Sequence, residues 1–337
     1  MEFQRKENVF KKENKIIIKY NYKEPSAQNT RKIQDINKRM IYNIFKNIIS
    51  LLTFNNSINK ISSNTRIMNL KFSYIILSIK QGNNSIYNEG KHDCSKYIPH
   101  PDEIFINGKN QSIIKSNYIF NETNNNVILK WENEFNDTTC MFYQCKQISS
   151  IDLSNFNSSL IKKTRAMFCG CSSLVSINMS NFDTSKVKDM AYMFSGCKIS
   201  SLDLSEFYTT EVRNFFKMFN DCSSLKSLDL SSFDTSKVKE MSYMFNGCTQ
   251  LYSLNISNFN TSGVINMSYI FTGCESLNFL DLSFFDTSKV KNISYMFSVC
   301  KNLTFLYFSI FNTSEIQEMN EIFKDCFNLE NLGLFSN

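Results

Sequence analysis

The amino-acid sequence predicts an α/β fold: a right-handed solenoid in which every repeat contributes one short strand and one short helix. Two observations predict it. The motif Phe-x-x-Cys occurs eight times between residues 142 and 326, with neighbouring copies 26 residues apart, except for one interval of 25 between Cys197 and Cys222. The residues after each cysteine follow the pattern Leu-x-x-Leu-x-Leu or a close relative of it, as in residues 225–230. A fixed period of this size with this leucine pattern is typical of leucine-rich repeats.

Each repeat divides into a strand and a helical segment. The Leu-x-Leu at the end of the leucine pattern alternates apolar and polar residues, which predicts a short strand. Further along, the apolar residues of segment 238–248 recur at spacings of 3, 3, 1 and 3, which predicts one face of a short helix. Because a single repeat cannot bury its apolar face, successive repeats must stack. We therefore expect residues 137–337, seven full copies and a partial one, to form the solenoid.

The segment before the repeats predicts a small β-rich cap over residues 69–136. FSYIILSIKQ and EIFINGKNQSIIKS are rich in strand-forming residues, and Asn107-Gly108 is a strong signal for a two-residue hairpin turn. A solenoid needs its open end covered to remain soluble. The single tryptophan, Trp131, lies where the cap meets the first repeat, and we expect it to fill the core there.

Residues 1–66 differ from the rest of the chain. They carry 14 Lys/Arg and 5 Asp/Glu, a net charge of +9, and show little pattern, which predicts a largely disordered basic tail. An amphipathic helix at residues 31–54 is the exception, and a basic amphipathic helix can also contact a membrane surface. The first 20 residues show no secretory signal. If translation began at Met40, the apolar segment 40–54 would resemble a weak signal sequence.

The composition argues against an enzyme. The chain has two histidines, both before the repeats, and no glycine-rich phosphate loop, so we expect no catalytic residues, no cofactor and no metal. The Asp-Thr-Ser triplet, as at residues 234–236, looks like a candidate site, but it recurs in several repeats and drifts to Tyr208 in one of them. A turn followed by the N-cap of the predicted helix explains it better.

The cysteines of the Phe-x-x-Cys motifs form a column. Because they occupy one position in successive repeats, we expect them on the helix side, too far apart for disulfides and buried as small hydrophobic residues. A ladder of free thiols favours a reducing compartment.

The best candidate for a binding site is the strand column. The residue between the two apolar strand positions faces outward, onto the predicted concave side. Serines follow two residues later and are expected on the same face. Small polar side chains leave such a surface accessible to an extended partner, although they also suit a merely solvated sheet. The candidate partner-binding residues are Asp152, Asn178, Asp203, Asp229, Asn255, Asp281, Tyr307, Ser205, Ser231, Ser257 and Ser283.

The repeat C-x-x-L-x-x-L-D-L-S-x-F-D-T-S-K-V-x-x-M-x-Y-M-F-x-G-C resembles the BspA-like leucine-rich repeats of bacterial and protist surface proteins. The lead-in PDEIFING at residues 101–108, followed by VILKWENEF at 127–135, is similar to the region that precedes such arrays in protist members. The resemblance covers residues 69–337. It implies a non-catalytic adhesion or recognition module at the cell surface or in the secreted fraction.

We therefore expect a binding module that recognises a protein or a glycan through the concave strand face. The alternative is an intracellular scaffold for protein–protein interaction, which the missing signal and the thiol ladder favour. No specific nucleic-acid binding is expected, since the basic tail has few aromatics and no known module. Membrane contact by residues 31–54 and a cytoplasmic location remain open alternatives.

Overall fold

The computed structural model describes residues 73–88, 99–308, 312 and 314–334. All of the described residues belong to one compact unit, which spans residues 71–337. The predicted basic segment 1–66, with its helix at 31–54, lies outside the described residues. The described residues form eleven strands and no helix, so this part of the chain has no helix with the length and apolarity needed to span a bilayer.

The N-terminal sheet is built from antiparallel strands. Strand β1 (Ser73–Ser85) pairs with β4 (Asn117–Trp131) on one side and with β5 (Ile148–Asp152) on the other. Strands β2 (Glu103–Ile106) and β3 (Lys109–Asn110) extend the sheet beyond β4. Since β5 belongs to the first repeat, the sheet joins the N-terminal strands directly to the repeats.

The hairpin between β2 and β3 confirms the turn predicted from Asn107-Gly108. Ile106 pairs with Lys109 in antiparallel register, and both turn residues have positive φ, 50° for Asn107 and 79° for Gly108. Two successive positive φ values define the tight turn that Asn-Gly favours.

Trp131 fills the core at the junction, as expected. It is 2% exposed, and its Nε1–H donates to the carbonyl oxygen of Pro99 at 3.1 Å. Its ring packs edge-on against Phe135 and Phe156, and Phe156 belongs to the first repeat. The aromatic cluster therefore ties the N-terminal sheet to the start of the repeats.

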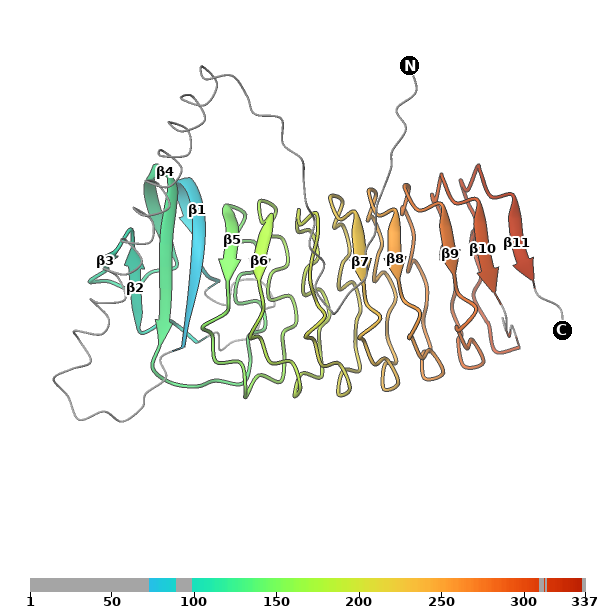
Figure 1. The fold of residues 1–337 in the computed structure, drawn as a ribbon, viewed down its shortest axis with the longest axis horizontal. Coiled ribbons are helices and arrows are strands. Elements are labelled where there is room, and N and C mark those ends of the chain that lie inside the picture. Colours follow the sequence, from blue (N-terminus) through green and yellow to red (C-terminus); the bar gives the residue numbers. More distant parts are fainter. Residues whose placement is uncertain (1–72, 89–98, 309–311, 313, 335–337) are drawn as a thin grey trace, which may run out of the picture. The chain divides into compact units, whose positions relative to one another are not determined.

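The strands of successive repeats lie side by side in chain order (Figure 1). Equivalent residues pair in parallel, so that Ser227 lies opposite Ser253 and Phe279 opposite Phe305. The strands form three sheets: β5 and β6 continue the N-terminal sheet, β7 pairs with β8, and β9, β10 and β11 form a third. The bounds are β6 (Ser176–Asn178), β7 (Ser227–Asp229), β8 (Ser253–Asn255), β9 (Phe279–Asp281), β10 (Phe305–Phe308) and β11 (Asn331–Leu334).

The 25-residue interval coincides with the gap between β6 and β7. Residues 201–203 occupy the strand position of that repeat but do not form a strand. The sequence lacks one residue after Lys198, which shortens the lead into this strand. At the strand position itself, one backbone bond joins this repeat to the next, from the N–H of Lys226 to the carbonyl oxygen of Ser200 at 3.1 Å.

A run of turns, rather than the predicted short helix, follows each strand. In residues 241–248 the amides alternate between two acceptors. The N–H groups of Met244, Asn246 and Cys248 donate three residues back, at 3.2 Å each. Those of Tyr243, Phe245 and Gly247 donate to carbonyl oxygens of the next repeat, at 2.8 to 3.0 Å.

Two left-handed residues per repeat explain why no helix forms. Tyr243 has a φ of 58° and Gly247 a φ of 72°, and the equivalent positions are also positive in the other repeats. A helix needs every residue near the right-handed region, so each left-handed residue ends it. The left-handed residues point every second backbone N–H of this segment toward the neighbouring repeat. The predicted helix was therefore wrong, because its apolar spacing also fits this pattern of turns.

The core of the repeats is a stack of phenylalanine rings. The Phe-x-x-Cys rings from Phe142 to Phe323 follow one another at centroid separations of 5.5 to 5.9 Å, with interplanar angles of at most 19°. Phe245, for example, is fully buried. Burial of such a side chain contributes about 1.5–3 kcal/mol relative to exposure. The apolar core therefore runs continuously through the stacked repeats.

The Asp-Thr-Ser triplets join neighbouring repeats. Thr235 is buried, its hydroxyl donates to the carbonyl oxygen of Asn260 at 2.9 Å, and it accepts from the N–H of Asn260 at 2.7 Å. Asp234 accepts from the N–H of Ser236 at 2.9 Å, which closes a local turn. The predicted turn is present. The threonine, however, binds the next coil rather than the N-terminus of a helix.

Candidate functional site

The outer face of the repeat sheets carries two columns of side chains. In β7 the side chain of Leu228 is buried, whereas Ser227 and Asp229 on either side of it are exposed. Parallel register places their equivalents side by side. The serine column comprises Ser150, Ser176, Ser201, Ser227 and Ser253 and continues with Phe279 and Phe305. The aspartate column comprises Asp152, Asn178, Asp203, Asp229, Asn255, Asp281 and Tyr307.

The structure brings the predicted aspartate column together on this face. Five of its members are exposed, while Asp152 and Tyr307 are half-buried. Neighbouring members touch at the first two positions, where the amide of Asn178 donates to Asp152 Oδ1 at 3.0 Å.

The aspartate column also shapes the end of each strand. Asp229 Oδ1 accepts the backbone N–H of Ser231 at 2.9 Å, and the equivalent bond recurs at the five other aspartates and asparagines of the column. The bonds join Asp152 to Ser154, Asn178 to Ser180, Asp203 to Ser205, Asn255 to Ser257 and Asp281 to Ser283, at 2.8 to 3.3 Å. Such side-chain bonds to the backbone two residues on are typical of turns that start at Asp or Asn.

These bonds also affect the acidity of the column. The backbone N–H of Ser205 lowers the pKa of Asp203, and that of Ser231 lowers the pKa of Asp229, because hydrogen bonds to a carboxylate favour its charged form. Both carboxylates are therefore negatively charged at neutral pH, and the face has an acidic character.

The four predicted serines lie past the strand ends. Ser205, Ser231, Ser257 and Ser283 supply the backbone N–H groups of the turns. Ser205 and Ser257 are exposed, and Ser231 and Ser283 are half-buried. The serines two residues before the aspartate column, such as Ser227, were not predicted as candidate binding residues. Counting back by two from Asp229 along the strand would have found them.

The two columns border a shallow depression of about 560 Å³. Small polar side chains from three adjacent repeats line it, and the edges of two leucine side chains lie between them. The lining residues are Ser201, Leu202, Asp203, Ser227, Leu228, Asp229, Ser253 and Asn255. A second depression of about 380 Å³ lies where the N-terminal sheet meets the first repeats, and it is lined mostly by serine and asparagine, including Ser150 and Ser176.

Aromatic side chains replace the small polar ones toward β10. Phe279 and Phe305 take the place of serine and are 50% and 40% exposed. Tyr307 takes the place of aspartate and lies opposite Asp281 in parallel register. The rings of Phe279 and Tyr307 are 5.6 Å apart, tilted by 54°. We call Phe279, Phe305 and Tyr307 the aromatic platform.

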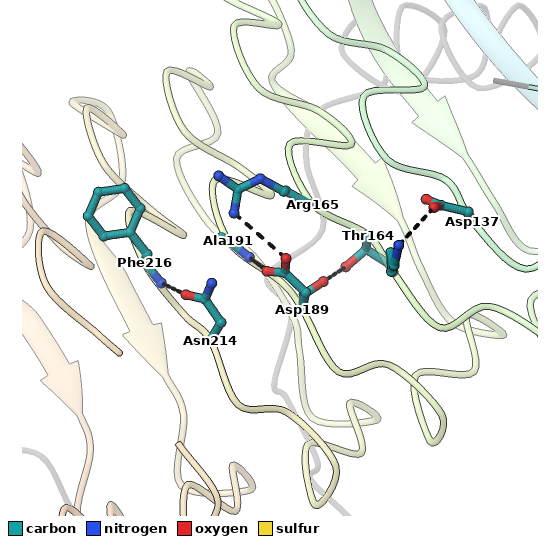
Figure 2. Close-up of polar contacts among 8 residues, drawn as sticks. Asp137, Thr164, Arg165, Asp189, Ala191, Asn214 and Phe216 are labelled. Carbon is teal, nitrogen blue, oxygen red and sulfur yellow. Dashed lines mark hydrogen bonds and ion pairs between the residues drawn. The ribbon is translucent and has the colours of Figure 1, made fainter. Parts of the chain in front are cut away.

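A second polar ladder runs along the turns, where single residues of successive repeats bridge in parallel. Its members are Asp137, Lys163, Asp189, Asn214, Glu240, Asn266, Asn292 and Glu318. Figure 2 shows the carboxylate of Asp189 accepting the N–H of Ala191 at 2.9 Å and facing Arg165 at 3.6 Å, and the amide of Asn214 accepting the N–H of Phe216 at 2.9 Å. Since these side chains are used in turns and inter-repeat contacts, the ladder has a structural role.

A column of half-buried tyrosines, Tyr192, Tyr243, Tyr269 and Tyr295, also runs along the turns of the repeats. The rings of Tyr243 and Tyr269 are 4.3 Å apart, and those of Tyr269 and Tyr295 are 4.7 Å apart. Lys217 occupies the column position in the 25-residue repeat, and its Nζ lies 4.7 Å from the ring centroid of Tyr243 and 5.7 Å from that of Tyr192. A cation between two rings continues the stack.

The cysteine column is buried from Cys145 to Cys300, whereas Cys326 is half-buried, and its thiols are protonated. Each thiol from Cys171 to Cys326 lies 2.9 to 3.2 Å from the carbonyl oxygen of a phenylalanine in the preceding repeat. Burial raises the pKa of Cys222 and of Cys274 to about 12. A thiol with so high a pKa is neither nucleophilic nor a ready metal ligand. The described residues contain no group of three or more His, Cys, Asp or Glu placed to hold a metal ion.

Cys140 differs from the cysteine column. It is disulfide-bonded, whereas the column members from Cys145 to Cys326 are free. Cys140 occupies the position that Tyr192 takes two repeats later, and both have positive φ, 59° in each case. Cys140 was not among the residues predicted from the sequence.

In a comparison with known proteins, the repeats are the part of the chain that matches a known family. No curated protein and no solved structure matches it. A family model matches residues 136–249 and again residues 225–333, and together these matches cover more than half of the chain. The matched residues are the stacked coils that carry the columns and ladders described above. The chain belongs to the family described as "Mycoplasma protein of unknown function, DUF285".

Proposed function

We propose that residues 137–337 form a leucine-rich-repeat solenoid that binds a protein or glycan partner through its outer sheet face and catalyses no reaction. The observation that carries the proposal is the depression of about 560 Å³ between the serine and aspartate columns. It is lined by exposed hydroxyl, carboxylate and amide groups from three repeats, which can hydrogen-bond a ligand that extends along the stack.

The serine column supports the proposal because the fold does not require serine at its exposed positions. Five repeats have serine there and two have phenylalanine, so side chains of very different volume are accommodated. Exposed positions with this freedom can vary with the ligand. The turn bonds of the aspartate column hold its side chains at the strand ends, which orders the acceptors before a partner arrives.

The experiment blocks the depression. The double variant Ser201→Arg/Ser227→Arg places two long side chains over the floor of the depression. Phe279, at the equivalent position of another repeat, indicates that the serine column accepts a large side chain. The control, Ser185→Arg/Ser236→Arg, adds the same residues at exposed positions of the Asp-Thr-Ser turns. Binding of extracellular-matrix proteins and of immobilised glycans would be compared by biolayer interferometry.

We expect the first variant to lose at least about tenfold in affinity and the control to keep the wild-type value. Equal affinity of both variants for every ligand that the wild type binds would contradict the proposed face. Circular dichroism would show that both variants are folded.

The proposed setting is the cell surface or the secreted fraction, as for BspA-like leucine-rich repeat proteins. The disulfide of Cys140 supports it, because structural disulfides persist in oxidising compartments. The free thiols of the cysteine column instead favour the alternative, an intracellular scaffold for protein–protein interaction. Burial weakens that argument, since buried thiols with raised pKa values are protected from oxidation wherever the protein resides.

Labelling of intact cells with a membrane-impermeant lysine reagent separates the two settings. A surface protein acquires the label before lysis, and trypsin treatment of intact cells removes it. Labelling only after lysis, together with a reduced Cys140 in protein isolated under acid quench, would support the intracellular scaffold.

A further inference from the structure

The aromatic platform distinguishes one end of the outer sheet face from the rest. The serine column carries a hydroxyl side chain in five repeats and then changes to Phe279 and Phe305. Apolar rings that are 50% and 40% exposed on a sheet of otherwise small polar residues incur a cost in water. Exposed apolar patches rimmed by polar residues mark binding sites.

The neighbours of the platform are charged and polar. Asp281 lies on the same face of β9 as Phe279, two residues away, and directly opposite Tyr307. Its Oδ1 accepts the N–H of Ser283 at 2.8 Å, which fixes the carboxylate at the edge of the rings. A ligand lying on the rings is therefore also within the reach of a carboxylate, and the columns continue with Asn255, Asp229 and Asp203.

We propose that the aromatic platform stacks a sugar ring of a neutral oligosaccharide whose hydroxyl groups hydrogen-bond the aspartate column. This inference rests on the proposed function and names the class of its ligand. The C–H face of a pyranose is apolar and flat enough to lie on an aromatic ring, while its hydroxyl groups point sideways, where Asp281 supplies an acceptor. Aromatic side chains with a polar neighbour suit ligands that have both kinds of surface.

The same arrangement disfavours other ligands. Nucleic acids also stack on aromatic side chains, but their phosphates require a basic groove, whereas the aspartate column is acidic. Sulfated or uronic-acid glycans meet the same repulsion. Protein hot spots are aromatic or arginine side chains inserted in desolvated pockets, and the depression on this face is open and lined by serine, aspartate and asparagine.

The repeats themselves provide the test variants. Phe279→Ser/Phe305→Ser gives the platform the residue that five other repeats have at this position, so the fold is retained. Phe284→Asn is the control: Phe284 is 61% exposed, lies outside the two columns, and has Asn155, Asn181 and Asn258 as its equivalents. Each variant of the full chain would be titrated with maltohexaose, cellohexaose, chitohexaose and, as an anionic probe, heparin hexasaccharide.

We expect the wild type to bind at least one neutral hexasaccharide more tightly than the heparin fragment. Phe279→Ser/Phe305→Ser should weaken that binding about tenfold or more, and Phe284→Asn should leave it unchanged. The inference is overturned if no neutral hexasaccharide binds, if heparin binds best, or if the platform variant binds like the wild type. Should Ser201→Arg/Ser227→Arg abolish binding of a protein ligand while the platform variant has no effect, the outer face stands as the binding surface and only the sugar platform fails.

Discussion

The thiol of Cys248 lies 3.2 Å from the carbonyl oxygen of Phe219, in the preceding repeat. The same oxygen accepts the backbone N–H of Cys222 at 3.1 Å, so the thiol supplies its second hydrogen bond. A buried carbonyl group has two lone pairs, and a weak S–H donor is a suitable partner where no backbone amide remains. The cysteine column therefore adds a directional contact between coils to its apolar packing.

The thiols should make stability depend on pH above neutrality. Burial raises the pKa of Cys222 and Cys274 to about 12, against 9.0 for an exposed thiol. The folded state thus holds protons that the unfolded chain releases, and stability is complete below pH 9 and is lost between about 9 and 12. Each such thiol lowers the free energy of unfolding by up to about 1.4 kcal/mol per pH unit in this window.

Urea unfolding between pH 7 and pH 11 measures this slope. Lysine and tyrosine also titrate there, so Cys274→Ala provides the control. This substitution removes one titrating thiol, so the free energy of unfolding should fall less steeply with pH, by close to one proton. The variant is expected to be less stable than the wild type at pH 7. An unchanged slope would mean that the buried thiol ionises as easily in the folded protein as in the unfolded chain.

Thr235 should contribute more to the free energy of unfolding than the size of its side chain suggests. Its hydroxyl exchanges two hydrogen bonds with the backbone of Asn260 in the next repeat. Thr235→Val keeps the shape but leaves that N–H and carbonyl group without their partner, which should cost about 1–3 kcal/mol. Thr235→Ser retains the hydroxyl and should cost less than Thr235→Val in urea unfolding. If the order of the two variants were reversed, packing of the methyl group would be the main contribution.

Val299 is expected to be strained. It has a φ of 61°, in the left-handed region, where Gly170, Gly196, Gly247 and Gly273 stand in equivalent positions. A β-branched residue is disfavoured there. Val299→Gly should therefore raise the free energy of unfolding by about 1 kcal/mol, even though glycine increases the entropy of the unfolded chain.

The reverse change in a neighbouring repeat is the control for Val299. Gly273→Val introduces the same strain at a φ of 70°, and an added Cβ there would contact the Cα of Gly247 at an ordinary 3.6 Å. Any loss of stability is then attributable to the backbone conformation rather than to a clash. A stabilising Gly273→Val would refute the explanation.

The sequence was sufficient to predict features that depend on period and alternation. The 26-residue spacing gave the stacking of equivalent residues, and the Leu-x-Leu alternation gave an outer face with Asp229 exposed. The hairpin at Asn107 followed from a turn that only a few dipeptides favour. In each case the residue type and its spacing determine one structure.

The helix could not be excluded from the sequence for a physical reason. Spacings of 3, 3, 1 and 3 bring apolar residues to one side both in a helix and in a series of turns with bonds three residues back. The difference lies in the sign of φ at Tyr243, and tyrosine gives no signal for the left-handed region. Gly247 did give one, since glycine four residues later occupies the second left-handed position. The sequence shows that the strand positions of the aromatic platform hold aromatic residues, but only the structure shows how far Phe279 and Phe305 are exposed.

Asp229 joins the candidate site to the fold, and two substitutions separate its roles. Its Oδ1 accepts the N–H of Ser231 at 2.9 Å, a bond that asparagine can also make, as Asn178 and Asn255 do in this column. Asp229→Asn should therefore unfold at the same urea concentration as the wild type, while Asp229→Ala, which leaves the strand end uncapped, should lose about 0.5–1 kcal/mol. Binding responds differently: Asp229→Asn removes the negative charge and weakens any charge-assisted hydrogen bond to a ligand, so affinity falls while stability is kept. If Asp229→Asn and Asp229→Ala destabilised the protein equally, the turn bond would not be the contribution of this residue to the fold, and a loss of affinity in either variant could no longer be assigned to contact with the ligand.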